Sequence, residues 1–354
     1  MNAVPQVRCL ALMTIPAAAL LLYGCASDRP GAALEFQTGE SVVLAGEIPG
    51  QLAFEPLLSR RVDVRSTYRD RLPRTVHYRP GRDYVLDTSG AIRRTANSRI
   101  PDYATNILYG KEDFLHTKFP GYGNNAFFVY VDYYHRQRWE RPLVRQELGI
   151  ARLPRTEKKL EAGERVRVVA FGDSITFGGE ASEPALIFWE RWADTLRHKY
   201  PRAAIEVTNG ATGGDTTVHG LQRLEAKVLA QQPDLVLVGF GMNDHNQNSV
   251  APDRFTRNLR AITERVRSCG AEVVLLSAFP PNPKWHCGSH QMEAYAEATE
   301  KVAREEQCAY ADVYHLWMSL AARKKPEDLL ANNINHPNDF GHWIYFEALQ
   351  SLGL

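Results

Sequence analysis

The sequence predicts two unlike parts, a smaller all-β, sandwich-like domain followed by a three-layer α/β/α domain built around a parallel sheet. Between about residues 34 and 134, short β-type runs are separated by turn residues such as Pro80-Gly81 and Ser89-Gly90. From Glu164 onward, apolar runs alternate with segments of helical period. That alternation is typical of a parallel sheet covered by helices on both faces.

The expected strands and helices follow these two sequence patterns along the chain. In the first part, strands are expected at 41–46, 62–68, 75–79, 83–87 and 126–134. In the second part, strands are expected at 165–171, 204–209, 234–240, 272–279 and 309–314, with helices at 185–200 and 255–268. We therefore assign residues 35–134 to the all-β accessory domain, 135–163 to a connecting segment and 164–354 to the α/β domain.

Length and charge limit the possible functions. The chain has 354 residues, which is long enough for two domains. Its formal net charge is +1, so it lacks the basic excess that binding to nucleic acid requires. We expect no nucleic-acid partner.

The N-terminal residues resemble an export signal. Arg8 precedes an apolar run over residues 9–23, which is too short to span a membrane and fits the core of a signal peptide. The run ends in Leu22-Tyr23-Gly24-Cys25, which resembles a bacterial lipobox. We expect residues 1–24 to be a lipoprotein-type signal peptide, Cys25 to be lipidated and 25–34 to be a linker. A plain secretory signal is the alternative.

Export determines how the cysteines and the location are interpreted. If Cys9 leaves with the signal peptide and Cys25 is acylated, three cysteines remain: Cys269, Cys287 and Cys308. A disulfide between Cys269 and Cys308 and buried free thiols both remain open. The expected location is the bacterial cell envelope, facing the periplasm or the cell surface, with a lipid anchor as the only contact with the membrane.

Polar residues stand where the expected parallel strands end, the edge at which such sheets bind ligands. Ser174 follows the first strand, a glycine cluster over 208–217 follows the second and Asn243 follows the third. His336 lies near the C-terminus. These residues supply a nucleophile, donors for an oxyanion and a base, which together indicate acyl transfer.

The same residues carry a resemblance to the SGNH (GDSL-type) hydrolases, which have a flavodoxin-like fold. Residues 171–176, 213–217, 241–244 and 336–337 resemble the four signature blocks of that family. The resemblance implies that Ser174 is the nucleophile and His336 the base. It implies an oxyanion hole formed by the Ser174 N–H, the Gly214 N–H and the Asn243 amide. No cofactor and no metal are implied.

One position departs from the family pattern. Most members have an aspartate three residues before the histidine, and here that position is Asn333. Its carbonyl oxygen can accept a hydrogen bond from His336 Nδ1–H, so we expect Asn333 to orient the imidazole. Asp339 and Asp312 are the reserve candidates.

Several readings of the function stay open. Exported SGNH enzymes with an added β module resemble carbohydrate esterases, so a carbohydrate (acetyl) esterase acting on small-molecule or polysaccharide esters is expected. The alternatives are a lipase or thioesterase for longer acyl chains, and a non-catalytic surface lipoprotein that binds a ligand. His286, Cys287 and His290 suggest a zinc cluster, but no fourth ligand is evident. We expect their loop to line the substrate site.

Overall fold

The computed structural model describes residues 33–71, 73–137 and 153–354. Residues 34–354 form one compact unit. The expected signal peptide and Cys25 lie outside the described residues. Within the described segments, no helix combines the length and the apolar character needed to cross a membrane.

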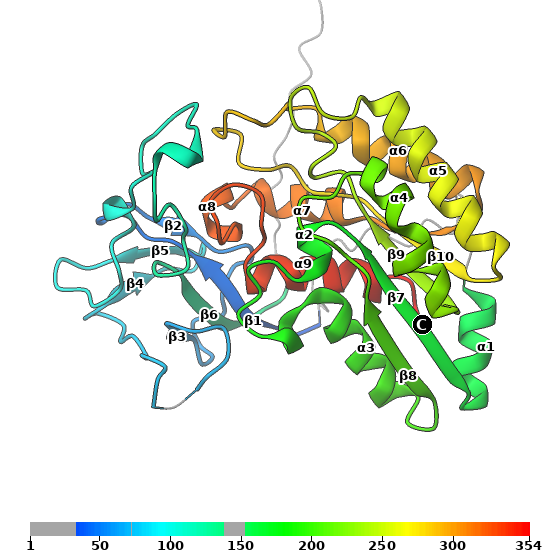
Figure 1. The fold of residues 1–354 in the computed structure, drawn as a ribbon. Helices are drawn as coiled ribbons and strands as arrows, with labels where there is room; N and C mark the ends of the chain where they lie inside the picture. The colour runs from blue at the N-terminus through cyan, green and yellow to red at the C-terminus, as the bar shows by residue number, and fades with distance from the viewer. Residues whose placement is uncertain (1–32, 72, 138–152) are drawn as a thin grey trace, which may run out of the picture. The chain divides into compact units, whose positions relative to one another are not determined.

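A five-stranded parallel sheet is the centre of the C-terminal part (Figure 1), in the order β11-β10-β9-β7-β8. Its strands are β7 (Arg165–Gly172), β8 (Ala204–Asn209), β9 (Leu235–Gly239), β10 (Glu272–Leu276) and β11 (Ala309–Ala311). Strands β9 and β10 read as apolar runs because they are almost completely buried, whereas most residues of the edge strand β8 are exposed. The strand order reverses between β7 and β9, and ligands of such sheets bind beyond the carboxyl ends at this point.

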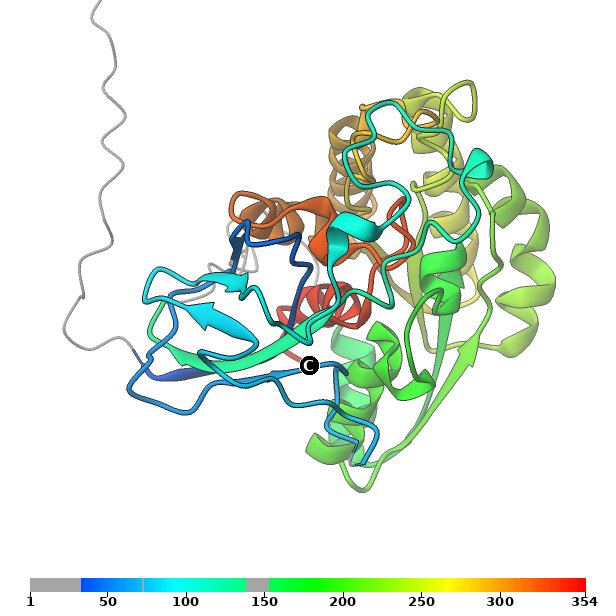
Figure 2. The same cartoon turned by 90° about the vertical axis from the view of Figure 1, so that its left-hand side faces the viewer.

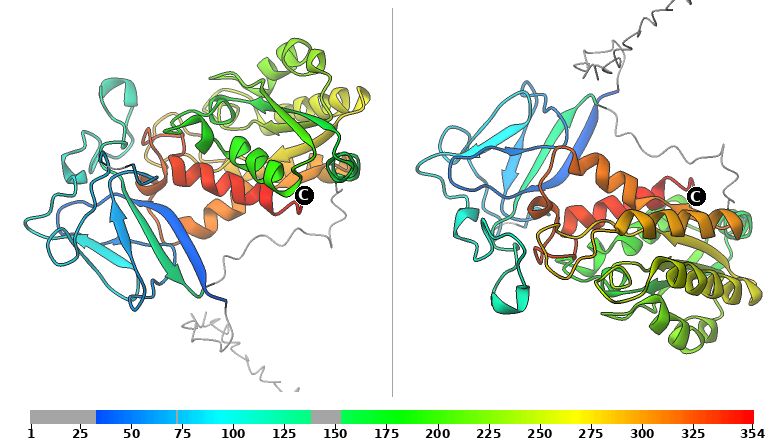
Figure 3. Two further views of the ribbon diagram at one scale, coloured as in Figure 1. Left: turned by 90° about the horizontal axis from the view of Figure 1, so that it is seen from below. Right: turned by 90° about the horizontal axis from the view of Figure 1, so that it is seen from above.

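Helices cover both faces of this sheet (Figure 3). Helices α3 (Phe188–Lys199) and α9 (Asp339–Gln350) pack on each other over one face. Helices α4 (Thr217–Lys227), α5 (Pro252–Ser268) and α6 (Met292–Glu305) pack side by side over the other. The remaining helices are α1 (Pro154–Ala162), α2 (Ser174–Phe177), α7 (Val313–Ala321) and α8 (Pro326–Leu329). The predicted three-layer α/β/α fold is confirmed.

The N-terminal part contains two small antiparallel sheets, as the all-β prediction requires. One has the order β1-β6-β3 and the other β2-β5-β4. The first contains β1 (Glu35–Val42), β3 (Asp63–Arg65) and β6 (Val129–His135). The second contains β2 (Gly50–Gln51), β4 (Tyr84–Leu86) and β5 (Ala91–Arg94). The run expected as a strand at 75–79 forms only an isolated bridge between His77 and Arg65.

The buried core continues from the N-terminal sheets into the α/β part without a break. The segment between β5 and β6 also reaches the C-terminal loops (Figure 2), where Phe114 and Trp285 share a small apolar cluster with Ile334. Phe114 N donates to Lys284 O at 2.9 Å. The two parts therefore share one hydrophobic interior and a second point of contact beside the C-terminal loops.

Candidate active site

Ser174 lies at the reversal of the strand order, directly after β7. Gly172 and Gly239 end β7 and β9 in register, and a Cβ atom on Gly172 would lie 2.1 Å from Gly239 O. Only glycine fits this approach. The carboxylate of Asp173 then accepts a hydrogen bond from Ile175 N at 2.9 Å and caps α2, the short helix that Ser174 begins. Ser174 is thus fixed by its backbone neighbours on both sides.

The structure brings Ser174 and His336 together, although 162 residues separate them in the sequence. Ser174 Oγ lies 2.8 Å from His336 Nε2, which is hydrogen-bond distance for transfer of the serine proton. Both residues are partly exposed, so a substrate can reach the pair. This distance is what the expected pairing of a serine nucleophile with a histidine base requires.

The glycine segment that contains the expected donor Gly214 approaches Ser174 at Gly213, and Asn243 is bonded to the same segment. A Cβ atom on Gly213 would lie 3.9 Å from Ser174 Cβ, and no atom lies within 4 Å of the corresponding position on Gly214. Gly214 has a φ of 78°, a conformation that suits glycine. Asn243 Nδ2 donates to Asp215 O at 2.9 Å, which orients the amide and leaves its second N–H available.

A compact hairpin carries His336. The side-chain oxygen of Asn332 accepts hydrogen bonds from the backbone N–H groups of Ile334, Asn335 and His336 at 2.9–3.0 Å. Ala331 N donates to His336 O at 2.9 Å and closes the hairpin. Sequence reasoning missed Asn332, although the run Asn332-Asn333-Ile334-Asn335 carries the signal of an Asx turn.

The expected contact between Asn333 and His336 is wrong. Asn333 adopts a φ of 58°, and its amide is buried between Tyr103 Oη (3.2 Å from Nδ2) and Asn282 Nδ2 (3.3 Å from Oδ1). No hydrogen bond among the described residues joins it to His336. The left-handed backbone turns this side chain away from the ring, so Asn333 supports the hairpin rather than the imidazole.

The two reserve carboxylates also have other partners. Asp339 accepts a hydrogen bond from Ser182 N at 2.8 Å. Asp312 caps α7 and lies 2.8 Å from His315 Nδ1. Both carboxylates therefore stabilise local backbone or a neighbouring side chain. Within the described part of the chain, no hydrogen bond joins either carboxylate to His336.

Burial dominates the electrostatics around the nucleophile. It lowers the pKa of His336, which keeps the imidazole neutral and able to accept a proton. The pKa of Asp173 is raised to about 7, mainly by burial and to a smaller extent by the nearby charge of Asp244. The pKa of Asp244 is also raised, to about 6. Burial is the main cause, and hydrogen bonds from Thr217 oppose it. Asp244 thus ties the third signature block to the start of α4.

The cysteine- and histidine-rich loop has structural contacts of its own. His286 Nδ1 lies 2.8 Å from Asp113 Oδ1, and Trp285 Nε1 donates to His116 at 3.0 Å. Among the described residues, no group of three or more His, Cys, Asp or Glu side chains is arranged to hold a metal ion. Cys269, Cys287 and Cys308 are all free thiols, with Cys308 buried and Cys269 exposed.

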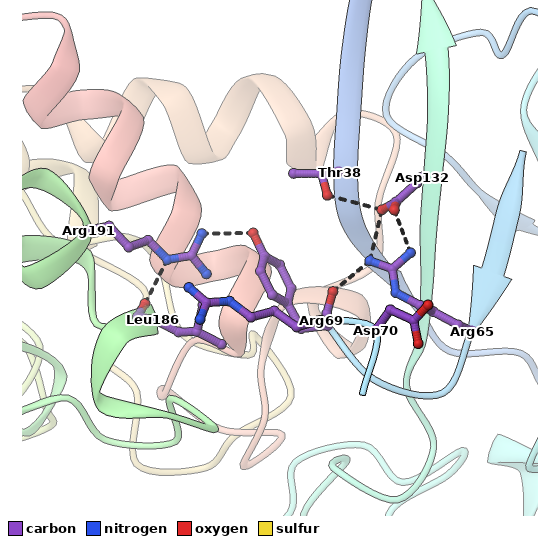
Figure 4. A pocket seen from close by; sticks show the side chains of 8 residues that line it. Thr38, Arg65, Arg69, Asp70, Asp132, Leu186 and Arg191 are labelled. Carbon is purple, nitrogen blue, oxygen red and sulfur yellow. Dashed lines mark hydrogen bonds and ion pairs between the residues drawn. The ribbon is translucent and has the colours of Figure 1, made fainter. Parts of the chain in front are cut away.

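A polar pocket of about 420 Å³ lies where the N-terminal sheet meets α3 (Figure 4). Arg191, from α3, donates to Tyr68 Oη at 2.7 Å and to Leu186 O at 2.9 Å. It also donates to Asp339 O, at the first residue of α9, at 3.0 Å. One guanidinium therefore links the N-terminal part to the helix that follows the His336 hairpin.

Comparisons with known proteins agree with this arrangement. A family model described as the GDSL-like lipase/acylhydrolase family matches residues 170–344. The arylesterase of Vibrio mimicus is 30% identical over 154 residues, which are 42% of this chain and 69% of that protein. The chain belongs to this family of hydrolases, which confirms the predicted resemblance to the SGNH (GDSL-type) enzymes.

Other relatives share shorter or more distant similarity. Esterase TesA of Pseudomonas aeruginosa is 35% identical over 104 residues, 29% of this chain and 49% of that protein. The lipoprotein YqeF of Bacillus subtilis is 30% identical over 118 residues, 32% of this chain and 48% of that protein. The chain thus spans about half the length of these two relatives. The solved acetylxylan esterase Axe2 of Geobacillus stearothermophilus has a TM-score of 0.48 and 24% identity, covering 53% of this chain and 94% of Axe2.

Proposed function

We propose that the protein is a serine esterase that hydrolyses carboxylic esters through an acyl-enzyme on Ser174. The observation that carries the proposal is the 2.8 Å distance between Ser174 Oγ and His336 Nε2. Nε2 accepts the hydroxyl proton as Oγ attacks the ester carbonyl. The resulting imidazolium then gives that proton to the leaving alcohol. Water, deprotonated by His336, attacks the acyl-enzyme, and the acid leaves as the proton returns to Ser174.

The negative charge of each tetrahedral intermediate needs hydrogen-bond donors on the side of the nucleophile away from His336. The proposed donors are the backbone N–H groups of Ser174 and Gly214 and the Asn243 amide. Asp215 O holds one N–H of that amide, at 2.9 Å from Nδ2, and so keeps the second in a fixed direction. Donors fixed before the reaction stabilise developing charge without having to reorganise.

The substrate class we favour is the acetylated carbohydrates. The acetylxylan esterase of Geobacillus stearothermophilus is 25% identical over 219 residues, 55% of this chain and 96% of that protein. Phe177, three residues after Ser174, is 57% exposed and offers an aromatic face of the kind on which a sugar ring stacks. The Escherichia coli relative named thioesterase 1/protease 1/lysophospholipase L1, 30% identical over 138 residues, supports the longer-chain alternative.

The direct test compares wild type with Ser174→Ala on p-nitrophenyl acetate and octanoate, then on acetylated xylan and acetylated mannan. We expect the wild type to hydrolyse acetate faster than octanoate and to release acetate from a polysaccharide. The variant should be inactive, and a fluorophosphonate probe should label only the wild type. Equal labelling of both proteins would refute Ser174 as the nucleophile. Faster hydrolysis of octanoate would favour the lipase or thioesterase alternative.

We also propose that the protein is exported and anchored to a membrane through a lipid on Cys25. Support comes from the lipobox-like residues 22–25 and from the likeness to the lipoprotein YqeF. Native protein should sediment with membranes and dissolve in detergent, whereas Cys25→Ser should appear in the soluble fraction. An unchanged distribution of the variant would rule out the anchor.

A further inference from the structure

The turn after the nucleophile helix lies against the side of His336 that faces away from Ser174. A Cβ atom on Gly179 would lie 3.2 Å from His336 Nδ1 and 3.3 Å from Cε1. Nε2, on the other side of the ring, contacts Ser174 Oγ. One short segment, Ser174 to Glu180, therefore reaches both nitrogens of the imidazole.

Glu180, the next residue in this turn, has a strained backbone. Its φ is 67°, in the left-handed region that glycine adopts freely and that costs other residues free energy. Gly178 occupies the same region two positions earlier, with a φ of 102°. Strain of this kind is concentrated at functional sites, where the surrounding structure enforces it. A glutamate here, where glycine would be more stable, suggests that its side chain has a role.

Neighbouring side chains hold the turn in place. Asn125 Nδ2, from the segment before β6, donates to Glu180 Oε2 at 2.9 Å. His342 Nε2, on α9, donates to Gly179 O at 3.2 Å. Burial lowers the pKa of His342 to about 3, so this second imidazole stays neutral and adds no charge beside His336. Glu180 is exposed, and its carboxylate has a hydrogen-bond partner, Asn125, from the N-terminal part.

The negative charge of Glu180 acts on His336. Burial lowers the pKa of His336, and the charge that opposes this shift belongs to Glu180. The aspartate position of the family is the neutral Asn333, while Asp339 and Asp312 bind other groups. A catalytic imidazole that becomes cationic gains most from a carboxylate on its Nδ1 side.

We propose that Glu180 is a positioning residue for His336, whose carboxylate stabilises the imidazolium that forms when Ser174 is deprotonated. It takes the electrostatic role that the aspartate three residues before the histidine has in other family members. The proposal rests on the esterase function proposed above. It also assigns Asn125, and through it the N-terminal part, a share in the charge distribution of the active site.

The test is the pH dependence of kcat/KM in Glu180→Gln, which keeps the shape and the acceptor for Asn125 but removes the charge. In the wild type, the acidic limb should lie below the ordinary histidine pKa of about 6.5. In the variant, the midpoint of this acidic limb should move to a lower pH by about half a pH unit to one pH unit. The plateau should fall about 3- to 10-fold, since one unit corresponds to a tenfold change in equilibrium.

Two further variants separate this role from a structural one. Glu183→Gln, three residues along the same segment and paired with Arg69 and Arg71, is the matched control and should keep the wild-type profile. Glu180→Gly removes the carboxylate and relieves the left-handed strain. It should lose activity as Glu180→Gln does, while its thermal midpoint stays equal to or above the wild-type value. If the pH profile of kcat/KM in both Glu180 variants keeps the plateau and the acidic limb of the wild type, the proposal is wrong.

A measurement without turnover keeps the two proposals distinguishable. The pKa of His336, followed by NMR of ¹⁵N-labelled imidazole, should be lower in Glu180→Gln than in the wild type and unchanged in Glu183→Gln. If the wild type hydrolyses no ester, the esterase function fails while this titration still reports on Glu180. If the pKa of His336 is the same in all three proteins, the Glu180 proposal fails whatever the activity.

Discussion

The buried ion pair between Lys324 and Glu40 provides a sharp test of how the N-terminal part stabilises the protein. Both side chains are 0% exposed, and Lys324 Nζ lies 2.7 Å from Glu40 Oε1. Glu40 also accepts hydrogen bonds from Ala53 N at 2.7 Å and from the Tyr133 hydroxyl. Lys324 lies two residues before α8, so the pair joins β1 to the start of the chain segment that leads to His336.

Replacing Lys324 by methionine keeps most of the volume and leaves the Glu40 carboxylate buried without its cation. Removing one partner of a buried pair typically costs about 3–5 kcal/mol. Because domains are usually stable by about 5–15 kcal/mol, this is a large fraction of the total. Glu40→Gln should cost a comparable amount, since it leaves the ammonium uncompensated.

The double variant Lys324→Met/Glu40→Gln should recover most of the loss. The glutamine oxygen can still accept from Ala53 N or Tyr133, and no buried charge remains. Urea unfolding followed by tryptophan fluorescence gives the three free energies and the coupling between the sites. A Lys324→Met cost below about 1 kcal/mol, or strictly additive costs in the double variant, would refute the reasoning.

Three further outcomes follow from the site. Asn243→Ala should lower kcat by about 10²–10³-fold if its amide donates to the oxyanion, and a change confined to KM would argue against that role. Asp173→Asn should raise stability at pH 8 by about 1–4 kcal/mol and have little effect at pH 4. The raised pKa of Asp173 means that its ionisation costs stability as pH rises from the unfolded value of 3.8 to about 7, and this cost should be visible in thermal melts. Asn333→Asp restores the residue type found in the family but should not raise kcat, because that side chain points to Tyr103 and Asn282; a several-fold gain would show that it reaches His336.

The inner strands of the parallel sheet were predictable because they are buried apolar runs, and the edge strand β8 was found although most of its residues are exposed. The expected strand at 204–209 coincides with β8, and the run at 234–240 contains β9 (Leu235–Gly239). The two-residue strand β2 and the four-residue strand β5 were missed, because so few residues give no readable alternation. Helix α1 was missed as well, inside a segment interpreted as a connection.

The family was readable from its signature blocks, but the direction of individual side chains was not. Spacing alone places Asn333 where an aspartate would be useful, and a backbone φ of 58° turns its amide elsewhere. Glu180 carries no sequence signal of its own, since its relation to His336 depends on a fold that joins positions far apart in the chain. The Glu40–Lys324 pair spans 284 residues and was equally invisible.

The attachment of the His336 hairpin has a consequence for how this protein can change. Ser41 Oγ and Val43 N donate to Asp328 at 2.6 and 2.8 Å, and Asn124 N donates to Ala331 O at 2.6 Å. A fragment beginning at Glu164 would keep every signature block and still lose the anchors of its base. The two parts are therefore expected to be inherited as a pair, because separating them would open the shared hydrophobic core and leave Lys324 without Glu40.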